Sequence, residues 1–185
     1  MSGSGILFIV ISIEYRKMLS FYLTNNDCLL KTEEGRQLMC MDVRKICECG
    51  AHNVQFHLRD NIMLPEVISR LFCPACPGNT PFDGSSMLYD NGWVIEYDME
   101  LACSLAEKKL KVDPDTVVPE FVFDSGYVCW QEMYPGEQAD IRDARQKIIE
   151  LLKEDRQQYL EAMQSWNINR IERLRAQGWR KVQRV

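Results

Sequence analysis

Four of the eight cysteines in this 185-residue sequence form two closely spaced pairs, and these pairs are its clearest chemical signal. Cys47 and Cys49 are separated by one residue, and Cys73 and Cys76 by two residues. Structural zinc sites take four tetrahedral ligands, and two short cysteine hooks supply four thiolates with little backbone rearrangement. The spacing therefore predicts a metal site with Zn²⁺ as the expected ion. Its predicted ligands are Cys47, Cys49, Cys73 and Cys76.

The two hooks together resemble a zinc ribbon. Cys73-Pro74-Ala75-Cys76 matches the usual second knuckle of that family, whereas the first knuckle has Cys-x-Cys where most ribbons have Cys-x-x-Cys. The resemblance covers roughly residues 44–80. Because zinc ribbons occur in many contexts, it implies a metal-binding β module and no particular activity.

Both the ligand set and the ion have an alternative. His52 and His57 are alternative ligands, because imidazole also binds zinc, although His57 alternates with apolar neighbours and is expected on the exposed face of a strand. Four thiolates also suit iron or an iron–sulfur centre. A closed four-thiolate site has no open coordination position, so we expect the metal to be structural.

The other candidate sites are weaker. The acidic row Glu96, Asp98 and Glu100 is expected on one solvated strand face, since no calcium-type loop or histidine accompanies it. The sequence contains no glycine-rich phosphate loop and no nucleophile elbow. A conventional enzyme is therefore disfavoured, and no catalytic residue is assigned.

Charge is distributed unevenly along the chain, whose formal net charge is −5 and whose pI is about 5.2. Residues 77–140 contain three basic and thirteen acidic side chains, whereas residues 141–185 contain eleven basic and six acidic ones. Basic residues beside Trp166 and Trp179 could contact nucleic acid. These residues are Arg170, Arg173, Arg175, Arg180, Lys181 and Arg184. The acidic body makes nucleic acid the less expected partner, because a basic footprint usually accompanies a basic domain.

The elements that must position the hooks indicate an α+β fold. Residues 43–82 form the zinc-ribbon-like module, in which Val54, Phe56 and Leu58 alternate with polar residues as in a half-buried strand. The middle region, 83–135, predicts a strand from Trp93, a helix that stops before Asp113-Pro114, and a hairpin. The expected hairpin joins residues 121–123 to 127–130 through Asp124-Ser125-Gly126.

The C-terminal part reads as one long amphipathic helix over 136–178, followed by a basic tail at 179–185. At the other end, residues 1–42 are poorly defined, and Met39 or Met41 is a candidate natural start. No apolar run reaches the roughly 20 residues that a membrane-spanning helix needs, and no secretory signal is evident. We therefore expect a cytoplasmic protein without a membrane partner.

These observations predict a zinc-stabilised interaction or adaptor protein. Its expected contacts are an unidentified protein partner or self-association through the C-terminal helix. Two alternatives stay open: a nucleic-acid-associated regulator that uses the basic C-terminal residues, and an iron-containing redox accessory protein.

Overall fold

The computed structural model describes residues 30–31, 37–76 and 81–183. The chain divides into two compact units, Met1–Cys40 and Met41–Val185. In the first unit the described elements are the strands β1 (Leu30–Lys31) and β2 (Gln37–Leu38), which pair antiparallel. Most of the predicted N-terminal segment, 1–42, lies outside the described residues, and its suggested alternative start stays a prediction.

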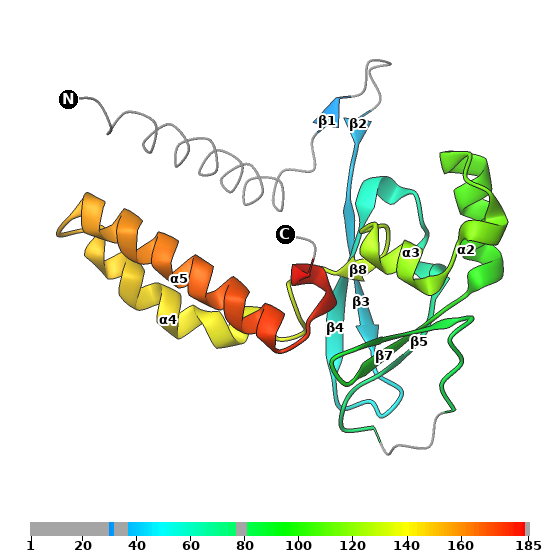
Figure 1. Ribbon diagram of the computed structural model, residues 1–185, viewed down its shortest axis with the longest axis horizontal. Coiled ribbons are helices and arrows are strands. Elements are labelled where there is room, and N and C mark those ends of the chain that lie inside the picture. Colours follow the sequence, from blue (N-terminus) through cyan, green and yellow to red (C-terminus); the bar gives the residue numbers. More distant parts are fainter. Residues whose placement is uncertain (1–29, 32–36, 77–80, 184–185) are drawn as a thin grey trace, which may run out of the picture. The chain divides into compact units, whose positions relative to one another are not determined.

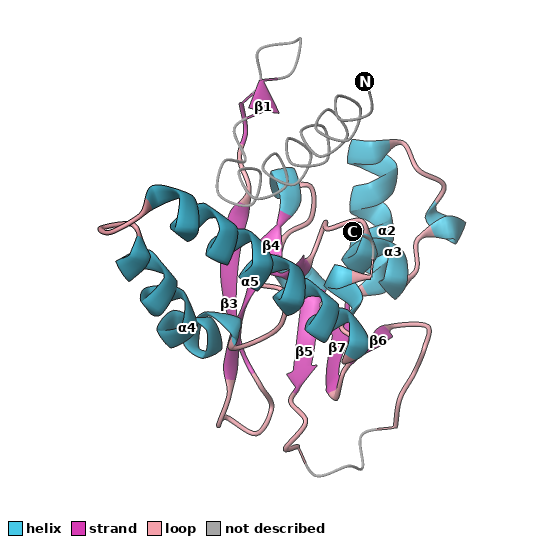
Figure 2. Ribbon diagram, turned by 60° about the vertical axis from the view of Figure 1, so that its left-hand side comes forward, coloured by secondary structure: helices cyan, strands magenta, loops and turns pink. Residues whose placement is uncertain are grey.

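The second unit contains two three-stranded antiparallel sheets (Figures 1 and 2). The first sheet has the order β3-β4-β8, and the second has the order β5-β7-β6. The strands are β3 (Met41–Ile46), β4 (Asn53–Leu58), β5 (Ile68–Phe72), β6 (Met87–Asp90), β7 (Trp93–Tyr97) and β8 (Cys129–Trp130). Short 3-10 helices occupy Arg59–Asn61, Pro65–Val67, Pro114–Thr116 and Arg180–Val182.

The alternation of apolar residues explains the strands that flank the hooks. In β4, Val54, Phe56 and Leu58 are buried, and the residues between them are exposed or half-buried. In β7, Trp93 and Ile95 are buried in the same alternating pattern. A period of two places every second side chain on one face of a strand, so both sequence-predicted strands are confirmed.

The helix predicted after β7 is also confirmed. Helix α2 (Met99–Leu105) begins where the Asp98 side chain accepts a hydrogen bond from Leu101 N, which satisfies a free amide of the first turn. A π-helical turn at Ala106–Leu110 continues it, and the chain leaves the helix at Lys111, whose φ is 59°. The predicted acidic row is therefore divided, because Asp98 is the helix cap and Glu96 accepts from Arg70.

The predicted hairpin in the middle region is wrong, because its first strand is a helix. Residues Pro119–Asp124 form α3, and β8 pairs with β4. Proline at the first turn of a helix removes no intrahelical hydrogen bond, and its fixed φ suits the helix. Gly126, expected in a hairpin loop, instead has its φ of 78° just after the end of α3, the position where helices commonly end in a left-handed residue.

The long C-terminal helix is confirmed as α5 (Arg156–Ala176), which gives the predicted α+β fold. The stretch expected as a single helix is divided, however, because α4 (Glu137–Leu151) precedes it. Asp155 makes the division: its side chain accepts from the amides of Gln157 and Gln158 and so caps a new helix start. Helices α4 and α5 lie side by side and form a helical hairpin (Figure 1).

The core of the second unit surrounds Trp130. The ring centroid of Trp130 lies 4.9 Å from that of Phe56 and 5.8 Å from those of Trp93 and Phe123. The same cluster contains three residues from the C-terminal part of the chain, Leu174, Trp179 and Val182. Both sheets and the C-terminal segment therefore share one core. Among the described residues, no helix is long and apolar enough to cross a membrane.

Candidate metal centre

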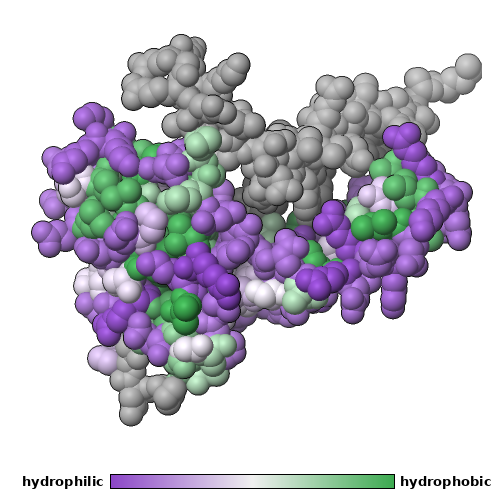
Figure 3. All heavy atoms as spheres, turned by 180° about the vertical axis from the view of Figure 1, so that it is seen from behind, coloured by the Kyte–Doolittle hydropathy of each residue, from purple (hydrophilic) through white to green (hydrophobic). Residues whose placement is uncertain are grey.

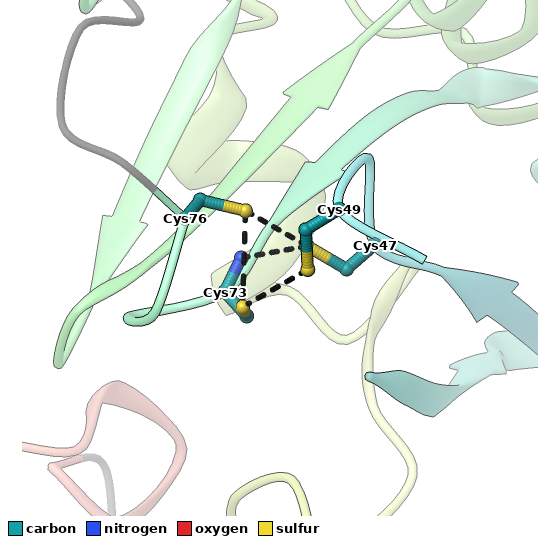
Figure 4. A group of neighbouring side chains, drawn as sticks. All are labelled: Cys47, Cys49, Cys73 and Cys76. Carbon is teal, nitrogen blue, oxygen red and sulfur yellow. Dashed lines mark hydrogen bonds between the residues drawn. The ribbon is translucent and has the colours of Figure 1, made fainter. Parts of the chain in front are cut away.

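Each cysteine hook follows the end of a strand, and the two strands belong to different sheets. Cys47 comes directly after β3, and Cys49 lies in the turn that leads to β4. Cys73 comes directly after β5, and Cys76 lies in the turn that follows. The second hook therefore approaches the first from the neighbouring sheet (Figure 4). The Sγ atoms of the four cysteines all lie within 4.8 Å of one another.

The sulfur separations are close to those that a tetrahedral metal requires. The Sγ atom of Cys47 lies 3.1 Å from that of Cys76 and 3.4 Å from that of Cys49. The Sγ atom of Cys73 lies 3.7 Å from those of Cys49 and Cys76. With Zn–S bonds of about 2.3 Å, tetrahedral geometry separates the sulfurs by about 3.8 Å. The Cys47–Cys76 separation of 3.1 Å would have to widen by about 0.7 Å, and the Cys47–Cys49 separation of 3.4 Å by about 0.4 Å, to admit the ion.

Backbone hydrogen bonds hold the hooks in this arrangement. Gly50 N donates to Cys47 O at 2.8 Å, and Cys76 N donates to Cys73 O at 2.9 Å, so each hook is closed by a tight turn. Gly50 has a φ of 73°, which glycine adopts without the steric cost that other residues incur. Cys73 N donates to the Cys47 sulfur at 3.0 Å, which connects the two hooks directly.

The thiols differ in burial and in pKa. Cys47 and Cys73 are only 2% and 3% exposed, and burial raises the pKa of Cys47 to about 12 and raises that of Cys73. Cys49 is exposed, and hydrogen bonds from His52 and from the Ala51 backbone lower its pKa to about 6. A coordinating cation deprotonates thiols, so metal binding would offset the cost of holding charge at the buried pair.

The two histidines named as alternative ligands lie in different places. His52 lies at the edge of the cluster, with its Nδ1 atom 3.2 Å from the Cys73 sulfur. His57 instead pairs with its cross-strand neighbour Asp42, with 2.9 Å between Nδ1 and Oδ1. His52 is therefore placed to hydrogen-bond the thiolates, whereas His57 belongs to the face of the first sheet.

A supporting contact that sequence reasoning missed lies behind the second hook. Asn91 and Gly92, with φ angles of 45° and 89°, form the two-residue turn between β6 and β7. A Cβ atom on Gly92 would lie 3.0 Å from Pro74 Cγ. The Asn-Gly pair is the signal that could have revealed the turn, since two-residue hairpins favour it. Its contact with the hook depends on the pairing of β5 with β7 within the second sheet, which joins segments distant in the sequence.

The remaining described cysteines lie outside the cluster. Cys40 is disulfide-bonded, whereas Cys103 and Cys129 are free. Cys103 Sγ contacts the Pro114 carbonyl at 3.6 Å, and Cys129 is buried. In the part of the chain that the structure describes, the four hook cysteines form the one group suited to a metal.

Four of the six residues predicted to contact nucleic acid, Arg170, Arg175, Arg180 and Lys181, make contacts within their own chain. The buried Arg170 donates from Nε to Glu137 Oε1 at 2.6 Å. Arg180 donates to both carboxylate oxygens of Asp124, at 3.1 and 2.9 Å. Lys181 donates to the backbone carbonyls of Trp130 and Gln131.

The other basic residues have varied positions. Arg173 and Arg175 are exposed, and Arg175 Nε donates to Val182 O at 3.3 Å. Arg184 lies outside the described residues. Among the described residues of the predicted basic surface, Arg173 and Arg175 are therefore the two that are exposed to solvent.

No protein-family model matches the chain, and neither does any curated protein or solved structure.

Proposed function

We propose that this protein is a metal-stabilised interaction protein in which the four hook cysteines hold one structural Zn²⁺. The observation that carries the proposal is the clustering of four cysteine sulfurs within 4.8 Å of one another, from hooks that end strands of two different sheets. Four thiolates would complete a tetrahedral zinc site and leave no position for a substrate or an activated water. The role of the ion would be to join the sheets.

The zinc-ribbon resemblance supports this assignment. Each hook is a tight turn after a strand, and amides close it around its first cysteine. The first hook departs from the common ribbon spacing, but Cys47 and Cys49 still place both sulfurs in the cluster. Iron is the alternative ion, because four thiolates also suit it. An absorption spectrum separates the two, since four-thiolate iron absorbs visible light and zinc does not.

The helical hairpin is the proposed interaction element. None of residues 138–169, all of which the structure describes, is buried. Ile149, Leu152, Leu160 and Ile168 are between 37% and 49% exposed. Figure 3 shows hydrophobic side chains interrupting the hydrophilic surface of this hairpin. Helices gain most of their stability from tertiary packing, so a partner that covers these side chains would stabilise the hairpin.

The contacts of the basic residues support the interaction proposal over a nucleic-acid-associated regulator. Arg170, Arg180 and Lys181 are engaged with carboxylates and carbonyls of their own chain. Phosphate binding by these side chains would compete with those contacts. The mixed charges of the surrounding helices also differ from the clustered basic footprint that nucleic-acid binding favours.

Loss of one hook ligand tests the metal assignment. We expect Cys73→Ser and Cys76→Ser to lose bound zinc and near-UV circular dichroism, because zinc binding supplies folding free energy. Cys103→Ser is the matched control, since Cys103 lies outside the cluster, and it should keep both signals. Full zinc content in the two hook variants would contradict the proposal.

Substitution on the hairpin tests the interaction role separately. We expect Leu160→Lys with Ile168→Lys to weaken self-association or partner binding, because lysine disfavours apolar contact, while zinc content stays unchanged. Light scattering gives the mass of the assembly, and crosslinking followed by mass spectrometry identifies bound chains. A monomer whose crosslinked partners are the same in wild type and variant would contradict the interaction role and leave the metal assignment intact.

A further inference from the structure

We propose that the metal centre is also a site of reversible oxidation, at which a peroxide reacts first with Cys49 and releases the metal. This inference rests on the proposed function, because it requires the four thiolates to hold Zn²⁺. It concerns the chemistry of one exposed ligand, and the hairpin has no part in it.

The four ligands differ sharply in their access to solvent. Cys47 and Cys73 are 2% and 3% exposed, so the first cysteine of each hook faces the protein interior. Cys76 is half-buried, and Cys49 is the exposed member of the cluster. Oxidation of cysteine follows thiolate character and exposure. Because metal ligation makes all four sulfurs thiolates, exposure decides which of them a soluble oxidant reaches first.

Cys49 has two neighbouring sulfurs with which it can form a disulfide. Its Sγ atom lies 3.4 Å from that of Cys47 and 3.7 Å from that of Cys73. A disulfide requires about 2.05 Å, so either pair must close by roughly 1.5 Å. The adjacent Gly50 gives the first hook the backbone freedom for this movement.

The residues around Cys49 leave its sulfur accessible. The Nδ1 atom of the neighbouring His52 lies 3.2 Å from the Cys73 sulfur. His52 is itself exposed, so it does not shield Cys49 from the solvent. The free thiols outside the cluster are more protected, since Cys129 is buried and Cys103 is half-buried against the Pro114 carbonyl.

The reaction proceeds in two balanced steps. The Cys49 thiolate attacks one oxygen of hydrogen peroxide, the O–O bond breaks, and the products are a sulfenic acid and hydroxide. The thiolate of Cys47 or Cys73 then attacks the Cys49 sulfur, a disulfide forms, and a second hydroxide leaves. Two thiolates are oxidised by two electrons, and the peroxide is reduced by the same two electrons. Zn²⁺ leaves because two of its four ligands are lost. A dithiol reductant reverses the oxidation, and added zinc then restores the site.

The test uses the wild-type protein, with zinc content measured before any oxidant is added. Hydrogen peroxide is added in small steps together with a sulfenic-acid trap, a chromophoric chelator reports released zinc, and peptide mass spectrometry locates the modified cysteine. We expect the trap on Cys49 at the earliest point, loss of all bound zinc on further oxidation, and recovery after dithiol and zinc are supplied. Cys103→Ser is the control and should release zinc at the wild-type rate.

The outcomes separate this inference from the proposal on which it rests. A protein without zinc at the start refutes the metal assignment and this inference together. Zinc that is present but retained under peroxide, or first labelling at Cys47, Cys73, Cys76, Cys103 or Cys129, refutes this inference alone. Failure to recover bound zinc after the dithiol and zinc are supplied refutes the reversibility of the oxidation.

Discussion

The contact between Gly92 and Pro74 shows how one residue in the second sheet can influence the metal centre. Gly92 has a φ of 89°, and a Cβ atom there would lie 3.0 and 3.2 Å from two side-chain atoms of Pro74. A side chain at this position therefore meets both backbone strain and a clash with the hook. Strain of the left-handed backbone alone costs roughly 1–2 kcal/mol.

We therefore predict that Gly92→Ala lowers the free energy of unfolding by at least about 1–2 kcal/mol and weakens zinc binding. Urea unfolding and competition with a zinc chelator measure the two effects. Gly126→Ala is the matched control, because Gly126 has a φ of 78° with nothing within 4 Å of the added Cβ atom. It should show the loss of stability without the loss of zinc affinity. Equal zinc affinities in both variants would argue against the role of the Pro74 contact.

Asp90 is a second residue whose chemistry can be tested alone. This carboxylate is 1% exposed, and it accepts from Trp130 Nε1 at 2.7 Å and from Arg180 N at 3.0 Å. Burial raises its pKa above the ordinary value of 3.8. The folded protein therefore binds more protons than the unfolded chain between these two pKa values. The favourable contribution is complete below pH 3.8 and declines as the pH rises through the folded-state pKa.

We predict that Asp90→Asn is destabilising by about 1–3 kcal/mol at acidic pH. The asparagine carbonyl oxygen can accept one of the two hydrogen bonds, but its amide N–H group would face the donor of the other. The difference in unfolding free energy between wild type and variant should narrow as the pH rises. Urea unfolding at a series of pH values measures this difference. A difference that is constant or grows with pH would contradict the raised pKa.

At the scale of elements, the helical hairpin is anchored at its base by a buried ion pair. Glu137 and Arg170 are 3% and 9% exposed, and Glu137 also accepts from Met133 N at 2.6 Å. Because no residue from 138 to 169 is buried, these two side chains lie where the hairpin joins the core. Removal of one partner of a buried pair leaves an uncompensated charge.

We predict that Glu137→Ala lowers the free energy of unfolding by about 3–5 kcal/mol and loosens α4 and α5. Hydrogen exchange in residues 138–169 and urea unfolding report these two effects. The control is Glu96→Gln, which removes the negative charge from the more exposed ion pair between Glu96 and Arg70. It should have little effect on the free energy of unfolding. A similar loss in both variants would show that burial of the pair does not matter.

The elements themselves could be predicted where the pattern was local. The alternation in β4 and β7 is visible in the sequence, and both strands form as that period predicts. Asp98 was expected in an acidic row on a strand face and instead caps α2. The hairpin prediction failed because residues 121–123 are too few to distinguish a strand from a helix, and Pro119 favours the helix. The break between α4 and α5 was missed because the chain there has no glycine or proline, and one side chain, Asp155, caps the second helix.

At the scale of the whole molecule, pairings between distant segments could not be predicted. The two-residue strand β8 joins β4 across about seventy residues, and β5 pairs with β7 across the second hook. The spacing of the cysteines predicted which four sulfurs gather. It did not predict that their hooks end strands of different sheets, because that depends on the packing around Trp130. A metal bound by both hooks would consequently connect the two sheets of the second unit.

Metal analysis of anaerobically purified protein, combined with an absorption spectrum, tests the central claim most directly. We predict one zinc per chain, no visible absorption band, and loss of near-UV circular dichroism when a chelator removes the ion. Iron with charge-transfer bands would replace the structural zinc site with a redox centre. A protein that folds fully without any metal would contradict the structural role of the metal site.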